Sequence, residues 1–161
     1  MFHLQKRKRI KMLKKILYWF LIIFALIQFI PVDRTNLPVK KSQNFVDIFN
    51  APTEVQVLLK NTCYDCHSNE TIYPDYAYVA PISWSIKNHI NEGREHLNFS
   101  IWSTYNKELK KGMLENTIAD LEQNRMPING YTAQHPEARL QASEKQTLIK
   151  YFKGILQSGN Y

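Results

Sequence analysis

The sequence predicts an all-α protein, and three observations indicate this fold class. Four segments carry apolar residues at intervals of three and four positions, as one face of a helix requires. Alternation of apolar and polar residues, which would indicate strands, is nearly absent. A basic cluster followed by an apolar run predicts a further helix at the N-terminus. With 161 residues, the chain has room for this segment and one domain.

The N-terminal segment is predicted to be a membrane anchor. A basic tail at 1–12 precedes the apolar run Ile16–Ile30. This run is shorter than the roughly 20 residues of a usual span, but lysine stems can extend its apolar length because their amines reach toward the interface. We therefore expect a transmembrane helix at 13–32. A cleaved signal peptide is the alternative, although no small-residue cleavage site occurs at 25–33.

The excess positive charge belongs to this N-terminal segment. The formal net charge is +7, but seven of the 21 Lys and Arg residues lie before position 31, and the other 14 balance the 14 Asp and Glu residues. A nucleic-acid-binding domain needs a basic face on its folded part, so no nucleic-acid partner is expected. The charge asymmetry predicts a single-pass protein of a bacterial inner membrane, with a cytoplasmic N-terminus and a periplasmic domain after Pro31.

A polar linker at 33–42 is expected to lead into one helical domain at 43–161. Its helices are predicted at about 52–61, from Pro81 to Gly93 or Leu97, at about 107–123, and from Ser143 through Leu156. The last of these begins with a capping-box pattern. Four short helices in roughly 120 residues bury only a small core. A buried cofactor would add the apolar surface that they lack.

The segment Cys63-Tyr64-Asp65-Cys66-His67 carries the chemistry of the domain. C-x-x-C-H is the attachment pattern of c-type haem. The two thiols add to the two vinyl groups of the macrocycle, and two intervening residues place both sulfurs along one ring edge. The histidine that follows faces the iron. The motif therefore predicts one covalent haem c on Cys63 and Cys66, with His67 as the proximal iron ligand.

Paired cysteines have three other uses, and each fits this sequence less well. A structural zinc site needs two further ligands at regular spacing, which His89, His96 and His135 do not supply. A thioredoxin-like redox pair lies beside a βαβ pattern, which is missing here. A disulfide between cysteines this close restrains little chain. Thiol–disulfide exchange nevertheless stays open as an alternative to haem attachment.

The sixth iron ligand is predicted to be Met126, which lies in an irregular stretch well after the haem motif. Methionine opposite histidine raises the reduction potential and suits electron transfer. The alternatives are a histidine (His89, His96 or His135) or an open position, and an open iron would permit small-ligand chemistry. Met113 lies inside a predicted helix, where methionine commonly fills the core.

Taken in order, several segments resemble the bacterial haem-binding domain family typical of Bacteroidetes. The residues that carry the resemblance are Asn61 through Asn69, Tyr73-Pro74, Pro81, Trp84, Met126-Pro127, Tyr131, His135-Pro136 and the helix beginning at Ser143. The match covers roughly 43–157. It implies an exported monohaem domain with a cytochrome c-like helical arrangement, in which Cys63, Cys66 and His67 bind haem and Met126 is the distal ligand. Members can accompany di-haem peroxidase-type proteins.

Two functions follow from these expectations. The first is a membrane-anchored periplasmic monohaem c-type cytochrome that transfers electrons between periplasmic redox proteins and is not an enzyme. The second is a haem enzyme or sensor with a labile sixth ligand, which binds peroxide or a diatomic gas.

Overall fold

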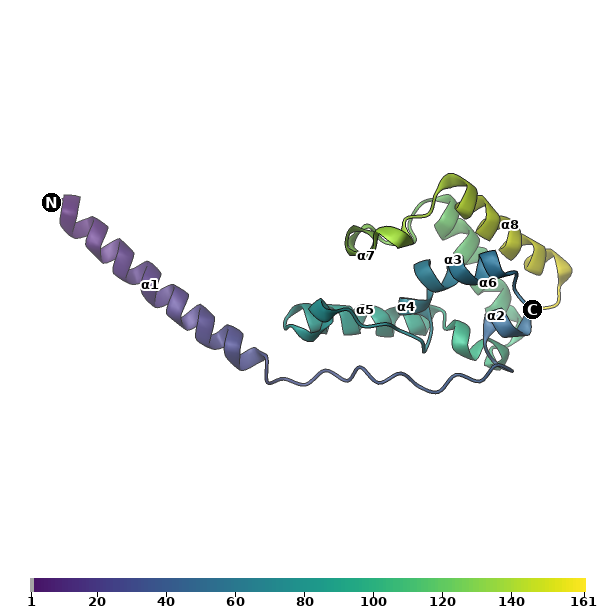
Figure 1. The fold of residues 1–161 in the computed structure, drawn as a ribbon, viewed down its shortest axis with the longest axis horizontal. Coiled ribbons are helices and arrows are strands. Elements are labelled where there is room, and N and C mark those ends of the chain that lie inside the picture. The colour runs from purple at the N-terminus through teal and green to yellow at the C-terminus, as the bar shows by residue number, and fades with distance from the viewer. Residues whose placement is uncertain (1) are drawn as a thin grey trace. The chain divides into compact units, whose positions relative to one another are not determined.

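The computed structural model describes residues 2–161, with side chains from Lys6 onward, and these residues form helices and loops without any strand (Figure 1). The all-α prediction is therefore confirmed. The α-helices are α1 (Phe2–Ile27), α2 (Phe45–Ile48), α3 (Thr53–Thr62), α4 (Tyr64–His67), α5 (Ile82–His96), α6 (Lys107–Glu122), α7 (Asn129–Gln134) and α8 (Ala142–Ser158). Three short 3-10 helices are η1 (Asp75–Tyr78), η2 (Phe99–Thr104) and η3 (Pro136–Ala138).

The four helices expected in the domain correspond to α3, α5, α6 and α8, each within a few residues of its predicted ends. The start of α8 differs in its cap. The sequence suggests Ser143 as the capping residue, whereas the helix is capped at Gln141, whose backbone N–H donates to Glu144 Oε2 at 2.7 Å. A carboxylate on this first turn satisfies an N–H group that the helix itself leaves without a partner.

The predicted transmembrane helix at 13–32 is wrong. Among residues 2–161, no helix combines the length and the apolar character needed to cross a bilayer. The basic residues lie within α1, and the helix ends at Ile27. Its uncharged part, Ile16–Ile27, is about 18 Å long at 1.5 Å per residue, against a hydrocarbon thickness of about 30 Å. The single-pass inner-membrane localisation, with a cytoplasmic N-terminus and a periplasmic domain, depended on that span and is corrected with it.

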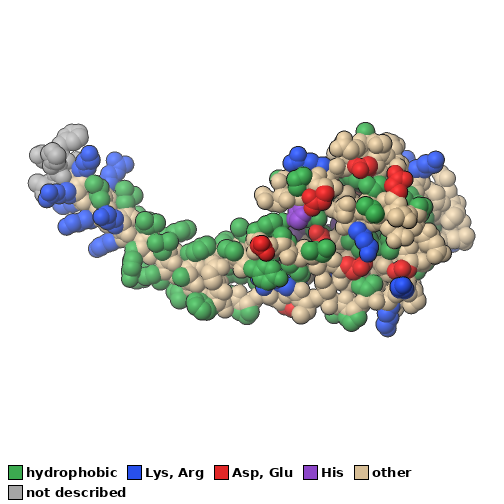
Figure 2. All heavy atoms as spheres, viewed as in Figure 1, with side chains coloured by type: hydrophobic (Ala, Val, Ile, Leu, Met, Phe, Trp, Pro, Cys, Tyr) green, Lys and Arg blue, Asp and Glu red, His purple; other side chains and the backbone are tan. Residues whose placement is uncertain are grey.

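The chain divides into two compact units, residues 1–34 with 74–88, and residues 35–73 with 89–161. In the first unit, α1 carries its lysine and arginine side chains toward its N-terminal end and apolar side chains beyond them (Figure 2). The helix ends beside Gln28, whose side-chain amide pairs with both backbone groups of Ala80 at 2.9 and 3.1 Å. Arg34 donates to Ala77 O at 2.9 Å and lies over the Tyr78 ring.

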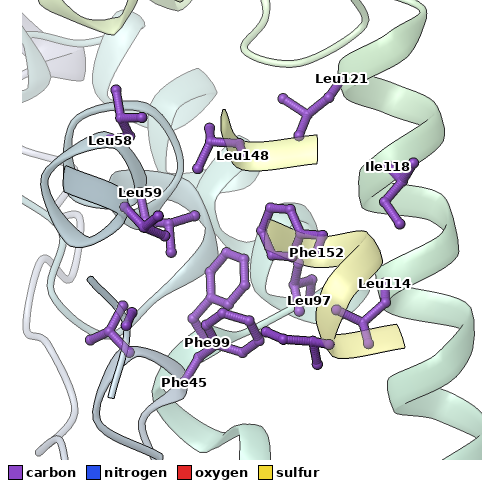
Figure 3. Packing of buried hydrophobic residues seen from close by; sticks show 14 of the residues in the cluster. Phe45, Leu58, Leu59, Leu97, Phe99, Leu114, Ile118, Leu121, Leu148 and Phe152 are labelled. Carbon is purple, nitrogen blue, oxygen red and sulfur yellow. The ribbon is translucent and has the colours of Figure 1, made fainter. Parts of the chain in front are cut away.

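The second unit holds the hydrophobic core. Helix α6 packs along α8, and α3 packs against α8 as well. Phe45, fully buried on α2, meets Phe99, Trp102 and Phe152 at ring-centroid distances of 5.0–5.8 Å. Leucine and isoleucine side chains from α3, α6 and α8 fill the space around these rings (Figure 3). Because the motif begins where α3 ends, this packing fixes its position.

Candidate functional site

The Cys63–His67 motif continues from α3 as a single tight helical turn. The Cys63 carbonyl accepts hydrogen bonds from the backbone N–H groups of Cys66 at 3.2 Å and His67 at 2.8 Å. These bonds form α4 and bring the second cysteine and the histidine back beside the first cysteine. The close spacing in sequence therefore becomes a close grouping in space.

The first spacer residue, Tyr64, anchors this turn in the core. Its side chain is 2% exposed, and its ring stacks on Phe99 with centroids 5.4 Å apart. Its hydroxyl donates to Asn44 Oδ1 at 3.0 Å. Burial raises the pKa of Tyr64, so the phenol stays neutral and keeps donating. With Tyr64 directed into the core, the turn has a fixed orientation.

The His67 imidazole is held by two backbone carbonyls. Its Nδ1 lies 2.9 Å from Gly93 O and 3.1 Å from Leu97 O, at the C-terminal end of α5. Both partners are acceptors, so Nδ1 carries the proton and Nε2 keeps a free lone pair. Burial lowers the pKa of His67, which favours this neutral form. A neutral imidazole with a fixed Nδ1–H is the form in which histidine binds a metal.

Gly93 allows α5 to approach the motif closely. A Cβ atom on this residue would lie 2.8 Å from Cys66 O and 3.3 Å from Cys66 Cβ. Any side chain would push α5 away and lengthen the hydrogen bonds to His67. Glycine is required at this position for proximity to the motif.

A pocket of about 480 Å³ opens beside the motif, within the size range typical of cofactor sites. Cys63, Cys66, His67 and Met126 all line it, so the four residues selected from the sequence meet at one place. Apolar side chains form much of the remaining wall: Leu97, Phe99, Met113, Leu121, Pro127 and Ile128. Met126 is 36% exposed and comes from the segment that follows α6.

Both cysteines are free thiols with raised pKa values. Burial raises the pKa of Cys63 and of Cys66 to about 11 each, and the hydroxyl of Thr62 lies 3.2 Å from Cys63 Sγ. Redox-active cysteines instead have lowered pKa values. Within the described part of the chain, no group of three His, Cys, Asp or Glu side chains is placed to hold a metal ion. The raised pKa values are unlike those of redox-active thiols, and the described residues do not supply the ligand set of a structural zinc site.

The other candidate ligands occupy different positions. His89 and His96 line the pocket on α5, the helix whose carbonyls hold His67. Met113 lines it from α6. His135 is not part of the lining, and its ring stacks on Tyr131 with centroids 4.4 Å apart.

Polar side chains other than the predicted ligands hold the motif in place. Arg94 donates to Ser68 O at 2.7 Å, to Thr71 Oγ1 at 2.9 Å and to Asn36 Oδ1 at 3.0 Å, and so secures the loop after His67. Asp65, the second spacer residue, accepts from Ile72 N and from the Tyr131 hydroxyl. Gly93, the one glycine within α5, is a sign in the sequence that another part of the chain packs closely there. No residue pattern in the sequence indicates the polar contacts of Arg94 and Asp65.

Comparison with known proteins identifies the family. The sequence profile described as the haem-binding domain matches residues 22–154, most of the chain. The chain belongs to the haem-binding domain family. No curated protein and no solved structure matches it.

The pocket of this haem-binding domain has the donors that a haem needs. A neutral imidazole offers nitrogen to iron, two thiols suit covalent attachment, and a thioether completes a common ligand set. Apolar walls suit the macrocycle. The residues present therefore fit a haem.

Proposed function

We propose that this haem-binding domain is a monohaem c-type cytochrome that transfers electrons. In this proposal Cys63 and Cys66 form thioethers with one haem, His67 is the proximal ligand and Met126 the distal ligand. The observation that carries it is the grouping of these four side chains in the lining of one pocket. Membership of the haem-binding domain family supports the cofactor itself.

The placement of α5 supports methionine rather than histidine as the distal ligand. The carbonyls that fix His67 belong to Gly93 on this helix and to Leu97 directly after it, and His89 and His96 lie on the helix as well. A second iron ligand would have to come from a part of the lining other than the one that holds His67. Met126 lines the pocket from the segment between α6 and α7, which is not part of α5, whereas Met113, the other methionine of the lining, lies within α6.

When bound, the haem supplies an iron that cycles between two oxidation states. The protein's part is to hold and orient it. His67 keeps its Nε2 lone pair available, the apolar part of the lining would pack against the macrocycle, and thioethers to Cys63 and Cys66 would prevent loss of the group. No step in this function requires a side chain to make or break a bond of a substrate. A second redox protein is the expected partner, and a di-haem peroxidase-type protein is the candidate.

The covalent attachment is tested on denatured protein. The full chain, produced together with a cytochrome c maturation apparatus, is separated on a denaturing gel and stained for haem peroxidase activity. Wild type should stain, because thioethers survive denaturation, whereas the double variant Cys63→Ala/Cys66→Ala should not. Cysteine-free protein that stains equally, or wild type that never stains, contradicts the c-type assignment.

A haem enzyme or sensor with a labile sixth ligand is the second candidate. The exposure of Met126, at 36%, favours it, because a solvent-accessible thioether is easier to displace than a buried one. Carbon monoxide separates the two functions. The ferrous cytochrome should bind it slowly or not at all, whereas a sensor should bind it readily. Rapid binding by wild type would favour the sensor over the electron carrier.

A further inference from the structure

The segment that carries Met126 has little apolar packing of its own. Residues 125–134 follow α6, and none of the residues of α7 is buried. A segment with few buried side chains gains little from the hydrophobic effect and opens locally at small free-energy cost. Its position therefore depends on individual polar contacts.

Most of these contacts are local. The backbone N–H groups of Arg125 and Met126 donate to Asp120 O at 2.9 and 3.4 Å. The Arg125 guanidinium binds the Asp120 carboxylate at 2.6 Å. Arg139 donates to Thr132 O at 3.1 Å. These bonds connect the segment to α6 and to the residues after it, and none reaches the Cys63–His67 turn.

The Tyr131 hydroxyl makes the connection to that turn. It donates to Asp65 Oδ2 at 2.8 Å and lies 3.4 Å from Asn61 O. Asp65 sits between the two cysteines. A hydrogen bond from a hydroxyl to a carboxylate is among the stronger kinds in proteins because the acceptor is charged.

The Asp65 carboxylate is itself fixed, so the bond has a defined direction. Its other oxygen, Oδ1, accepts from Ile72 N at 2.9 Å, and the Asp65 carbonyl accepts from Thr71 Oγ1 at 2.6 Å. On the other side, the ring of His135 stacks on the Tyr131 ring at an interplanar angle of 18°. The phenol is thus held between a stacked ring and an anchored carboxylate.

We propose that Tyr131 is a positioning residue, whose hydroxyl ties the Met126 segment to the second spacer residue of the motif and so keeps the thioether at the pocket. This inference rests on the proposed function, since Met126 is there the distal ligand. One carboxylate of the motif then serves both sides of the site. Asp65 fixes the loop that follows His67, and through Tyr131 it also fixes the segment that supplies the opposite ligand.

The hydroxyl is tested with Tyr131→Phe, which keeps the ring and its stacking on His135. Tyr78→Phe is the matched control, because Tyr78 is exposed and lies in the other compact unit. Hydrogen exchange is first measured on the full chain as it is purified. Amides of 126–134 should exchange about tenfold faster in Tyr131→Phe, as loss of a bond to a charged group implies, and the control should match wild type. Unchanged exchange in Tyr131→Phe overturns the proposal.

The haem-loaded chain gives the second measurement. The weak near-infrared band of methionine-ligated ferric haem should diminish in Tyr131→Phe, and carbon monoxide should bind the ferrous form about tenfold faster, in line with the opening of the segment. Asp65→Ala should reproduce this effect, and adding Tyr131→Phe to it should change nothing further. A full band and a wild-type binding rate in Tyr131→Phe overturn the proposal. Wild type without covalent haem instead refutes the proposed function, and the exchange experiment still decides whether Tyr131 ties the segment.

Discussion

The two sides of the pocket are built differently. On one side, His67 is mostly buried, its Nδ1 is held by two carbonyls at the end of α5, and the turn that carries it is anchored by Tyr64. On the other, Met126 is 36% exposed, and its segment leads into a helix without a buried residue. The fold itself fixes the histidine side, whereas a few polar contacts fix the methionine side. Changes of ligation should therefore begin at Met126.

Exchange of each proposed iron ligand for alanine should give the largest contrast between the two sides. His67→Ala removes the ligand that the fold orients, and we expect complete loss of the normal low-spin haem spectrum. Met126→Ala should keep its covalent haem, because the thiols and His67 are untouched, but should lose the near-infrared band and bind carbon monoxide. Absorption spectra of the ferric and ferrous full chain measure both. Equal spectra for the two variants would contradict the proposed difference between the histidine side and the methionine side.

Two glycines sharpen the comparison at the level of stability. Gly93→Ala places a Cβ atom 2.8 Å from Cys66 O, so α5 must shift. We expect a loss of about 1–3 kcal/mol, as overpacked sites show. Gly112→Ala on α6 is the matched control, since nothing lies within 4 Å of its Cβ position. This substitution should stabilise the protein by about 0.5–1 kcal/mol, because alanine is the better helix former. Urea unfolding of the chain without haem gives both values, and a Gly93→Ala protein as stable as wild type would contradict the close packing.

Substitution of one arginine on each side should give the smallest difference in stability between the two sides. Arg94, on the histidine side, donates three hydrogen bonds, two to the loop after the motif and one to Asn36, so Arg94→Ala should lose about 1–2 kcal/mol. Arg125, on the methionine side, is paired with Asp120 at an exposed position. Because exposed ion pairs contribute about 0–1 kcal/mol, Arg125→Ala should cost less. Thermal unfolding of both variants in the same buffer shows which one loses more stability. A larger loss in Arg125→Ala than in Arg94→Ala would mean that the methionine side is the more firmly fixed.

The sequence predicts the longer helices that bury an apolar stripe, and it misses α7, which buries nothing, and α2, which buries Phe45 and Val46 but is too short to show a period. Helices α3 and α8 carry buried residues at three- and four-residue intervals, and their expected positions agree with the structure. Helix α7 has no buried residue, so it leaves no apolar pattern to recognise. The expected membrane span was wrong because α1 ends at Ile27, before the apolar run does. Hydropathy alone does not reveal that the helix ends before Gln28, whose amide pairs with the backbone of Ala80, far along the chain.

The candidate site shows the same division. The motif and Met126 could be selected from the sequence because residue type and spacing indicate their chemistry, and the structure places them in the lining of one pocket. The partners of His67 were not, because a backbone carbonyl has no residue type and those of Gly93 and Leu97 lie 26 and 30 positions away. The bond between Tyr131 and Asp65 spans 66 positions and likewise has no sequence pattern.

The hydrogen bonds of His67 also serve the helix that provides them. The last carbonyls of an α-helix have no partner within it, and the Leu97 carbonyl, just past the end of α5, finds one in the imidazole N–H. His67 thus acts as a C-terminal cap. The rotation of the ring is arrested when the helix forms, so a ligand at His67, as proposed above, would be oriented during folding and would lose little entropy on binding a metal. The partial negative charge at this helix end also faces the imidazole, which makes Nε2 a stronger electron donor.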